Sequence, residues 1–493
     1  MRLLLVQASD GASRSQQAQD LVAAGAEGSV SSLLVNVEAI FNSYTLIFLI
    51  AFFVTLLFTP IARRMALAAG VVDHPDRARK VHRQPTPYLG GLAVFLGLMA
   101  GIALSYAHMD SAAAELGSVP MAIVIGMIAI TFTGLADDVW GWDPRLKIAG
   151  QLVAAAALAY NDIGVRVAEG VLVPMFGSRG EPLFTLGDLQ VLNSHLYYWA
   201  GTAIIAFFVL GGCNAANLID GLDGLLAGVI GIVAIGLLAI SVMMALNLPE
   251  DVAGESTFSG ARLVLSFALL GAVLGFLPHN FNPATIFLGD AGSLLLGFMS
   301  VTIILLLGEF GQTHLVFAGL IVFSIPIMDT ALAIVRRKLS GRPMSSADDQ
   351  HIHHQLRRAL GGVKRAVFAL YGVGLAFAML GVTLAACTMF TSLRLRVVYV
   401  VVLVLFSFIG VLAIKAARRV RLQTAASSAA LSAATSSPSK PRSIDIPTPG
   451  ASGAPGVPGT PGGGAAAAPA SRAAKPAAKS SAKPAANPSA TSM

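Results

Sequence analysis

Four polar side chains interrupt a very apolar part of the chain and form its most informative feature. They are Asn214, Asn217, Asp220 and Asp223, all within the run from Asn214 to Leu225. An ionisable group in the core of a bilayer is expensive, so a segment that faces lipid would not carry these residues. We therefore expect them at a membrane surface or in a cavity lined by protein.

Two neighbouring acids, Asp137 and Asp138, end another apolar run, and Lys147 follows them. Paired carboxylates suit Mg²⁺ binding or proton handling. A lysine at this distance is able to meet a phosphate as a point charge. The plain alternative is a helix end with solvated acids, followed by a lysine whose stem crosses apolar surface to reach water.

A glycine-rich stretch from Phe287 to Ser293 places Asp290 at the start of a third apolar run. Glycines allow a close approach of the backbone, and the N-terminus of a helix favours anions. In that setting Asp290 makes sense as an Mg²⁺ ligand beside a diphosphate. The alternative is that Asp290 only caps the helix.

Three histidines, His351, His353 and His354, lie in a loop that is rich in arginine. Three histidines together suggest zinc, but no cysteine accompanies them here. Arg357 and Arg358 follow closely, and together with the histidines they suit phosphate oxygens better. We expect this loop to contact a phosphate.

A basic segment before Gly90 contains Lys80 and Arg83. One interpretation is a loop that is basic only because it faces the cytoplasm. The sharper hypothesis is a basic rim that helps to bind an anionic substrate.

The composition indicates which elements must position these residues. Hydrophobic residues make up 55% of the 493 residues and charged residues only 12%, whereas a soluble domain carries about 25% charged residues. We expect an all-α polytopic membrane protein with about eleven transmembrane helices, since each crossing needs roughly 20 apolar residues. The predicted spans are 44–62, 90–107, 119–136, 147–162, 196–213, 224–247, 261–278, 290–308, 314–335, 366–387 and 395–414.

Lysine and arginine gather in alternate loops, which sets the expected orientation. The loops after spans 44–62 and 314–335 and the segment after 395–414 are basic, whereas 107–117 and 248–260 contain neither residue. With eleven spans the N-terminus is outside and the C-terminus is cytoplasmic. All of the polar groups above then belong to cytoplasmic loops, where they would assemble one active site.

Three regions follow from this pattern. Residues 1–43 are an N-terminal extracytoplasmic segment, and 44–415 form the membrane-embedded domain. Residues 422–493 are rich in Ala, Pro, Ser and Lys and almost lack large apolar side chains, so we expect a disordered cytoplasmic tail. In the external loop, the runs 171–173 and 184–186 suggest a short hairpin.

Carboxylates for a divalent cation, surrounded by basic and amide groups at a membrane surface, favour one kind of chemistry. They suit phosphoryl transfer between a water-soluble phosphate ester and a lipid phosphate. No feature of the chain indicates a nucleic-acid partner.

Taken together, the motifs resemble the polyprenyl-phosphate N-acetylhexosamine-1-phosphate transferases, glycosyltransferase family 4. The resemblance covers roughly residues 44–415, and the His-Ile-His-His sequence is similar to that of bacterial undecaprenyl-phosphate N-acetylglucosamine-1-phosphate transferases. The related phospho-MurNAc-pentapeptide translocases usually carry three consecutive histidines there. The motifs are 73–80 with 85–91, 137–151, 214–225, 275–280 with 289–293, and 347–354.

The resemblance implies transfer of N-acetylglucosamine 1-phosphate from UDP-N-acetylglucosamine to undecaprenyl phosphate, with Mg²⁺ (or Mn²⁺) as cofactor. It implies an enzyme of the bacterial inner membrane, embedded in the lipid bilayer, that initiates cell-envelope polysaccharide synthesis, and it leaves a homodimer open. By the same analogy Asp290 and Asn217 hold the metal, and Phe287 lies near the uracil. The implied catalytic residues are Asp137, Asp138, Asp290, His353 and His354, and the implied substrate-binding residues are Lys80, Arg83, Lys147, Asn214, Asn217, Asp220, Asp223, Phe287 and His351.

Two alternatives remain at this point. The same reaction with another UDP-N-acetylhexosamine is one, because no residue identifies the sugar. An ion-coupled transporter that uses its intramembrane acids is the other. Transport predicts acids near the middle of helices, whereas the acids here are predicted to cluster at one face.

Overall fold

The structure is a computed structural model, and it describes most of the predicted membrane domain. The described residues are 37–73, 85–107, 118–186, 189–247, 258–339, 351–391 and 397–405, with scattered positions up to Arg418. The predicted N-terminal segment lies outside them except for 37–43, which belong to the first helix. The predicted tail, 422–493, lies wholly outside them, as do Lys80 and Arg83.

Long apolar helices make up the described bundle. Eight of them are long and apolar enough to cross a bilayer, or nine if one bent pair counts as a single span. The eight are Val37–Ala69, α2 (Gly90–Ala107), α4 (Met121–Trp140), α7 (Asn193–Ile219), α8 (Leu225–Leu246), α9 (Ser259–Asn280), α10 (Gly289–Leu306) and α14 (Val363–Phe390).

Shorter elements complete the described part of the chain. They are β1 (Val72–Asp73), β2 (Thr86–Pro87), α5 (Pro144–Tyr160), the 3₁₀ helix η1 (Val165–Val167), α6 (Glu169–Phe176), β3 (Pro182–Leu186), β4 (Leu189–Leu192), α11 (Thr313–Val322), α12 (Ser324–Leu339) and α13 (Ile352–Leu360). Both strand pairs, β1 with β2 and β3 with β4, are antiparallel.

The prediction of an all-α polytopic membrane protein is confirmed, whereas the number eleven stays a prediction. The predicted span 147–162 corresponds to α5, whose 17 residues fall short of the roughly 20 that a crossing needs. The predicted span 395–414 corresponds to a helix that is described continuously only over 397–405. The predicted external hairpin is wrong in its first strand, because 171–173 lie in α6 and β3 pairs with β4 instead.

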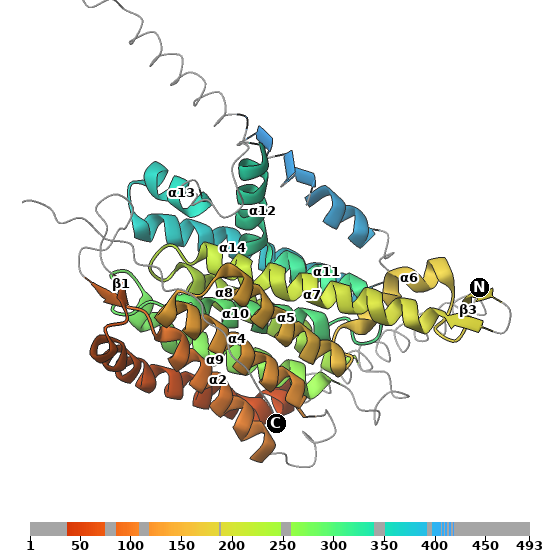
Figure 1. The fold of residues 1–493 in the computed structure, drawn as a ribbon, viewed down its shortest axis with the longest axis horizontal. Coiled ribbons are helices and arrows are strands. Elements are labelled where there is room, and N and C mark those ends of the chain that lie inside the picture. The colour runs from red at the N-terminus through yellow and green to blue at the C-terminus, as the bar shows by residue number, and fades with distance from the viewer. Residues whose placement is uncertain are drawn as a thin grey trace, which may run out of the picture. The chain divides into compact units, whose positions relative to one another are not determined.

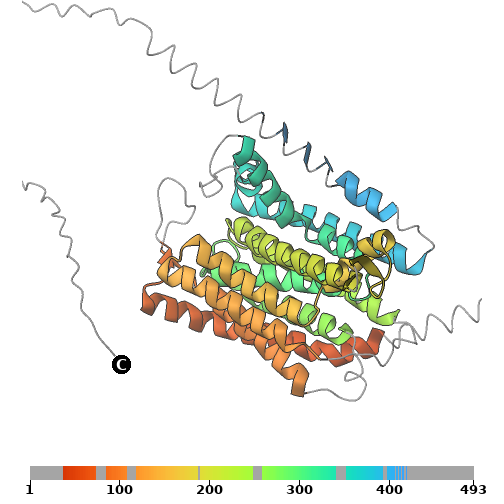
Figure 2. The same cartoon turned by 45° about the vertical axis from the view of Figure 1, so that its right-hand side comes forward.

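One predicted span, 314–335, is broken in the structure. It forms α11 and α12, whose axes differ by 78°. In Figure 1 α12 stands upright, away from the long helices that run across the view, and Figure 2 shows it at the top of the bundle. Pro326 lies just after the break and lacks the N–H that would bond back to Val322 across it.

The centre of the bundle is α10, which packs against α2, α4, α7, α8, α9 and α11. Every residue of α10 from Ala291 to Leu306 is buried, as expected for a helix that is apolar on all sides. Small residues let its neighbours approach closely. A Cβ on Gly134 of α4 would lie 2.4 Å from the Cα of Ala291, so the two helices are in contact through their backbones.

The start of α10 is also tied to the start of α2 by backbone hydrogen bonds. The N–H of Phe287 donates to the carbonyl of Pro87 at 2.9 Å, and the N–H groups of Gly90 and Gly91 donate back to the carbonyls of Phe287 and Leu288 at 2.9 and 2.8 Å. The polar segment before α10 is thereby fixed against the core.

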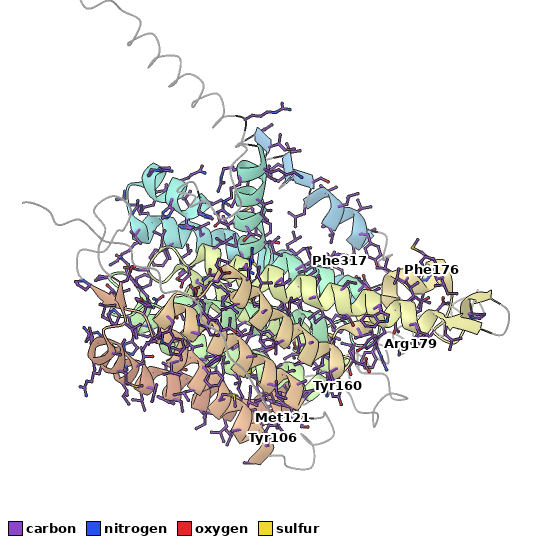
Figure 3. All side chains as sticks on the ribbon, viewed as in Figure 1. Tyr106, Met121, Tyr160, Phe176, Arg179 and Phe317 are labelled. Carbon is purple, nitrogen blue, oxygen red and sulfur yellow. The ribbon has the colours of Figure 1, made fainter. Side chains whose placement is uncertain are left out.

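The other end of the bundle carries exposed aromatic and apolar side chains. Tyr106, Met121 and Tyr160 gather there in Figure 3, at the end of α2, the start of α4 and the end of α5. Their exposed fractions are 44%, 60% and 87%. Tyrosine at a helix end is typical of a membrane–water interface.

Candidate active site at the start of α10

Asp290 lies in the first turn of α10 and contacts Asp138 in the last turn of α4, at the end of that helix opposite Met121. The preceding Gly289 has a φ of +69°, a conformation that residues with a Cβ rarely adopt. A Cβ at Gly289 would also lie 2.6 Å from the Oδ2 of Asp138 and 2.7 Å from the carbonyl oxygen of Tyr88. Glycine is therefore required here on two counts, conformation and space.

The carboxylate of Asp138 holds the beginning of α10. Its Oδ1 accepts the N–H of Asp290 at 2.8 Å, and its Oδ2 accepts the N–H of Ala291 at 3.0 Å. The first N–H groups of a helix lack partners within the helix, and here an acid from α4 satisfies two of them. Asp138 thus fixes the position of Asp290. Its predicted catalytic role stays a prediction.

Asp290 itself is held between a cation and an amide. The Nζ of Lys147 forms a close ion pair with its Oδ2 and lies 3.3 Å from the Oδ2 of Asp137. The Nδ2 of Asn217 donates to its Oδ1 at 2.7 Å and to the Oγ of Ser293 at 2.9 Å. Residues of α4, α5, α7 and α10 therefore meet at one point.

The loop after α7 adds two more acids. Asp223 accepts hydrogen bonds from the Nδ2 of Asn282 at 2.8 Å and the N–H of Ala284 at 3.1 Å, which holds the loop after α9 in place. Asp220, in contrast, has no hydrogen-bond partner among the described residues. Burial, together with the negative charge of Asp290 and other nearby acids, raises the pKa of Asp220 to about 8.

These acids are in electrostatic excess. Asp290 interacts electrostatically with Asp137, Asp138 and Asp220, and among the described residues Lys147 is the cation that pairs with Asp137 and Asp290. Carboxylate and amide oxygens are ligands that Mg²⁺ prefers. The donor set therefore fits a divalent cation: Asp290 and Asp220 would supply carboxylate oxygens, and Asn217 a side-chain carbonyl.

Two predicted residues lie at the edge of this cluster. Asn214 is one helical turn before Asn217, and its Nδ2 donates to the Oε1 of Gln151 and to the carbonyl of Leu210, both at 2.8 Å. It therefore joins α7 to α5 rather than contacting Asp290. Phe287 precedes α10 and is half-buried.

The histidine segment is organised by an acid that the sequence analysis missed. Asp329 of α12 is 1% exposed. Its Oδ2 lies 2.8 Å from the Nδ1 of His351 and 3.7 Å from the Nδ1 of His353. The signal was a single acid inside the predicted span 314–335, because an ionisable residue in an apolar span is by default a candidate functional residue.

This segment also contacts the loop after α7. A Cβ on Gly221 would overlap the Nε2 of His353, so the imidazole lies directly against the backbone between Asp220 and Asp223. The ring of His354 is 4.3 Å from that of His353. The described polar segments are thus brought together at one end of the bundle, as the sequence predicted.

Residues 120–308 match the family model for glycosyl transferase family 4. A probable undecaprenyl-phosphate N-acetylglucosaminyl 1-phosphate transferase of Bacillus subtilis (strain 168) is 34% identical over 352 residues, which are 70% of this chain and 86% of that protein. A decaprenyl-phosphate N-acetylglucosaminephosphotransferase of Mycolicibacterium smegmatis is 37% identical over 339 residues, 66% of this chain and 78% of that protein. A phospho-N-acetylmuramoyl-pentapeptide-transferase of Bacillus anthracis is 28% identical over 340 residues, 68% of this chain and 94% of that protein.

Proposed function

Because this chain belongs to glycosyl transferase family 4 and is a phosphosugar transferase, we propose that it transfers N-acetylglucosamine 1-phosphate from UDP-N-acetylglucosamine to undecaprenyl phosphate. The products are undecaprenyl-diphospho-N-acetylglucosamine and UMP. The observation that carries this proposal is Asp290, held between Lys147 and Asn217 at the start of the central helix. The names of the relatives support the choice of sugar and lipid.

We infer a single displacement. A phosphate monoester has a second pKa of about 6, so the lipid phosphate is mostly dianionic at neutral pH and attacks without much help from a base. One of its oxygens forms a bond to the β-phosphorus of the UDP-sugar. The bond between that phosphorus and the bridging oxygen breaks, and UMP leaves with the electron pair. Asp137 accepts the residual proton or orients the attacking phosphate.

Mg²⁺, or Mn²⁺, would offset the charge of the diphosphate and of the departing UMP when bound. Asp290 and Asn217 would hold it, with Asp220 nearby. Besides the metal ion, the protein itself supplies a positive charge on Lys147. The ion pairs of Lys147 with Asp137 and Asp290 keep it beside both acids. An ion pair held in place before the substrate binds needs little rearrangement in the transition state.

The remaining predicted residues surround this point in the proposal. His353 and His354 act in catalysis, and the substrate-binding groups include Asp223, Phe287 near the uracil, and His351. Asn214 would bind substrate beside its hydrogen bond to Gln151, and Lys80 and Arg83, which lie outside the described residues, would bind the anionic substrate.

A transporter is not favoured. Asp137 and Asp138 lie in the last turn of α4, and Asp290 lies in the first turn of α10. Ion coupling would call for acids near mid-helix and reachable from both faces. The acids of the cluster are instead at helix ends on one side of the bundle.

The proposal is tested by assaying the purified full-length protein with undecaprenyl phosphate and a panel of UDP-sugars. We expect lipid-linked sugar and stoichiometric UMP with UDP-N-acetylglucosamine at the highest kcat/KM. A higher kcat/KM for another UDP-N-acetylhexosamine would change the sugar that we assign, but not the type of reaction. Absence of lipid-linked product with every sugar would contradict the proposal.

The order of events has its own test. A direct displacement needs both substrates bound together, so double-reciprocal plots should intersect and no UMP should appear from UDP-sugar alone. A covalent aspartyl-phosphate would release UMP before the lipid acts. A stoichiometric burst of UMP without lipid, lost in Asp137→Asn, would overturn the single displacement.

We also propose that the active site faces the cytoplasm of a bacterial inner membrane, with the N-terminus outside. The excess of lysine and arginine in the loops on the active-site face supports this orientation. Single cysteines at Ser345 and Ser178, in a chain whose two native cysteines are replaced, should react with an impermeant reagent from opposite sides of sealed vesicles. Reaction from the same side would contradict it.

A further inference from the structure

Asp329 uses both of its carboxylate oxygens to hold the histidine segment. Its Oδ1 accepts the N–H of Ile352 at 2.8 Å, and its Oδ2 lies 2.8 Å from the Nδ1 of His351. The two side chains are shielded from solvent, with Asp329 1% and His351 6% exposed. A buried carboxylate is costly unless it is fully hydrogen-bonded, so the two contacts define one arrangement of this segment.

The first contact positions α13. Ile352 is the first residue of α13, and the preceding His351 makes no side-chain cap of its own. The N–H of Ile352 is one of the donors that a helix leaves without an internal partner. Asp329 satisfies it from α12, a different helix, and so fixes where α13 begins.

The second contact fixes the imidazole of His351. A carboxylate only accepts hydrogen bonds, so the Nδ1 of His351 must carry the proton in this contact. The ring is then held in the orientation that directs its Nε2 away from Asp329. When one nitrogen of an imidazole is bound, its partner sets which tautomer the ring adopts.

The arrangement extends from Asp329 to the candidate active site. The rings of His351 and His353 are stacked, with centroids 5.4 Å apart and planes at 14°. The Nε2 of His353 in turn lies against Gly221, in the loop that carries Asp220. In addition, α12 packs on α7, the helix that precedes this loop.

We propose that Asp329 is a positioning residue for the transfer reaction: it fixes the tautomer of His351 and the place of α13, and thereby sets how His351 meets the diphosphate of the nucleotide sugar and how His353 rests on the loop that carries Asp220. The expected loss of activity rests on the function proposed above. The tautomer of His351 and the start of α13 do not depend on that function. Asp329 itself does not touch substrate.

The informative variant is Asp329→Asn, because it separates the two contacts. Its side-chain carbonyl still accepts the N–H of Ile352, which keeps the start of α13. Its NH₂ group faces the Nδ1 of His351, and that nitrogen must then become an acceptor. We expect the proton of His351 to move from Nδ1 to Nε2, and kcat/KM per folded chain to fall roughly 10- to 100-fold, as for other partners that orient a functional imidazole.

The tautomer is measured without substrate. The full-length protein is labelled with ¹⁵N-histidine, and the ring resonances of His351 are assigned as those that disappear in His351→Gln. We expect a protonated Nδ1 in the wild type and a protonated Nε2 in Asp329→Asn. An unchanged His351 ring pattern in that variant would overturn the proposal, whatever sugar the enzyme uses.

Two further variants separate positioning from simple support of the fold. Asp329→Glu keeps a carboxylate and should restore the tautomer and more activity than Asp329→Asn. If the acid only capped α13, Asn would be the better replacement, so an activity of Asn equal to or above that of Glu would overturn the proposal. Asp162→Asn is the control, because it makes the same acid-to-amide change at an exposed position far from the histidine segment; its activity should stay within twofold.

The same three residues also have the composition of a metal site. The nearest ligand atoms of Asp329, His351 and His353 lie within 4.8 Å of one another. Our proposal predicts no stoichiometric transition metal in the purified protein. One zinc per chain that is lost in Asp329→Asn would overturn it, since the imidazole nitrogens would then be ligands rather than groups presented to a diphosphate.

Discussion

Charged side chains lie at both ends of α10, partly buried at its start and almost fully buried just beyond its far end, and the two ends balance their charges differently. At its start, Asp290 shares the cation Lys147 with Asp137. Just beyond its far end, Glu309 pairs one to one with Arg262 at 2.5 Å, and these two side chains are 5% and 0% exposed. The first arrangement leaves negative charge in excess, and the second is neutral.

Hydrogen bonds sharpen the difference. The second oxygen of Glu309 accepts the N–H of Phe258 at 2.7 Å, and Arg262 also donates to the carbonyl of Leu306 and the Oγ of Ser259. The charges of the pair are thus matched to each other and to neighbouring protein groups, although the Nε of Arg262 has no hydrogen-bond partner among the described residues and Glu309 lines a small cavity. A buried charge alone is therefore weak evidence of function in this fold; acids that exceed their cations are stronger evidence.

The largest loss of transfer activity should come from a substitution in the acid cluster at the start of α10. Asp290→Asn removes the carboxylate between Lys147 and Asn217, which is the predicted metal ligand. We expect turnover to fall at least a thousandfold, about 4 kcal/mol in the barrier, while the protein still folds. The measurement is transfer of labelled sugar phosphate to the lipid, with thermal unfolding in detergent to confirm folding.

The control for that variant is Asp162→Asn, an exposed acid at the far end. It removes the same charge from the same chain and should leave turnover unchanged. If Asp290→Asn keeps nearly wild-type turnover at low Mg²⁺, then Asp290 does not bind the catalytic metal ion.

The second effect should be on stability rather than on chemistry. Glu309→Gln leaves the guanidinium of Arg262 buried without a counter-charge, and breaking a buried pair typically costs about 3 kcal/mol or more. We expect a lower unfolding temperature and, per folded chain, a turnover within twofold of the wild type. Replacing both partners together, Arg262→Met with Glu309→Leu, should recover most of the stability.

A loss of turnover per folded chain in Glu309→Gln would contradict the assignment of that pair to structure. The double replacement then distinguishes the causes. Recovered stability without recovered turnover would mean that the charges themselves take part in function.

The sequence indicated that certain residues belong together at the start of α10, because polar groups stand out beside apolar runs. Their roles in the reaction stay a prediction. Asp137, Asp290 and Asn217 each adjoin such a run, and the structure brings them together with Lys147. The orientation inferred from alternating basic loops stays a prediction. A pattern of residue types does not show which residue each side chain contacts through a hydrogen bond or an ion pair.

Two charged residues inside predicted spans, one acid and one base, were missed for that reason. Asp329 lies within a predicted span, and so does Arg262, the partner of Glu309. Each was read as a part of a span, because hydropathy averages over a whole window. Likewise, the sequence did not indicate that Asp138 accepts the N–H groups of Asp290 and Ala291, since this contact depends on how α4 packs on α10.

The third effect tests whether Asp138 acts through Asp290. In Asp138→Asn one N–H at the start of α10 loses its acceptor and faces an NH₂ group instead. Hydrogen bonds to a charged group contribute about 2 kcal/mol, which corresponds to a roughly 30-fold loss of kcat/KM at fixed Mg²⁺. We expect part of the loss to be recovered at high Mg²⁺, because a displaced Asp290 binds the ion more weakly.

A different result would give Asp138 a direct role. If the Mg²⁺ concentration for half-maximal activity is unchanged and only kcat falls, then the carboxylate of Asp138 takes part in the reaction itself. Thermal unfolding of the same variant separates either outcome from a general loss of structure.

The smallest effect should come from an ion pair at the far end that differs from Arg262–Glu309 in exposure. Arg179, labelled in Figure 3, pairs with Glu169 at 2.9 Å, and its side chain is 44% exposed. Water already stabilises the charge of Arg179, although the side chain of Glu169 is only 16% exposed. The usual contribution of a pair with an exposed partner is below about 1 kcal/mol. Arg179→Gln should therefore shift the unfolding temperature much less than Glu309→Gln does, and 0.5 M salt should remove most of the shift. If Arg179→Gln lowers the unfolding temperature as much as Glu309→Gln does, and salt does not change this, then burial does not explain why the Arg262–Glu309 pair stabilises the fold.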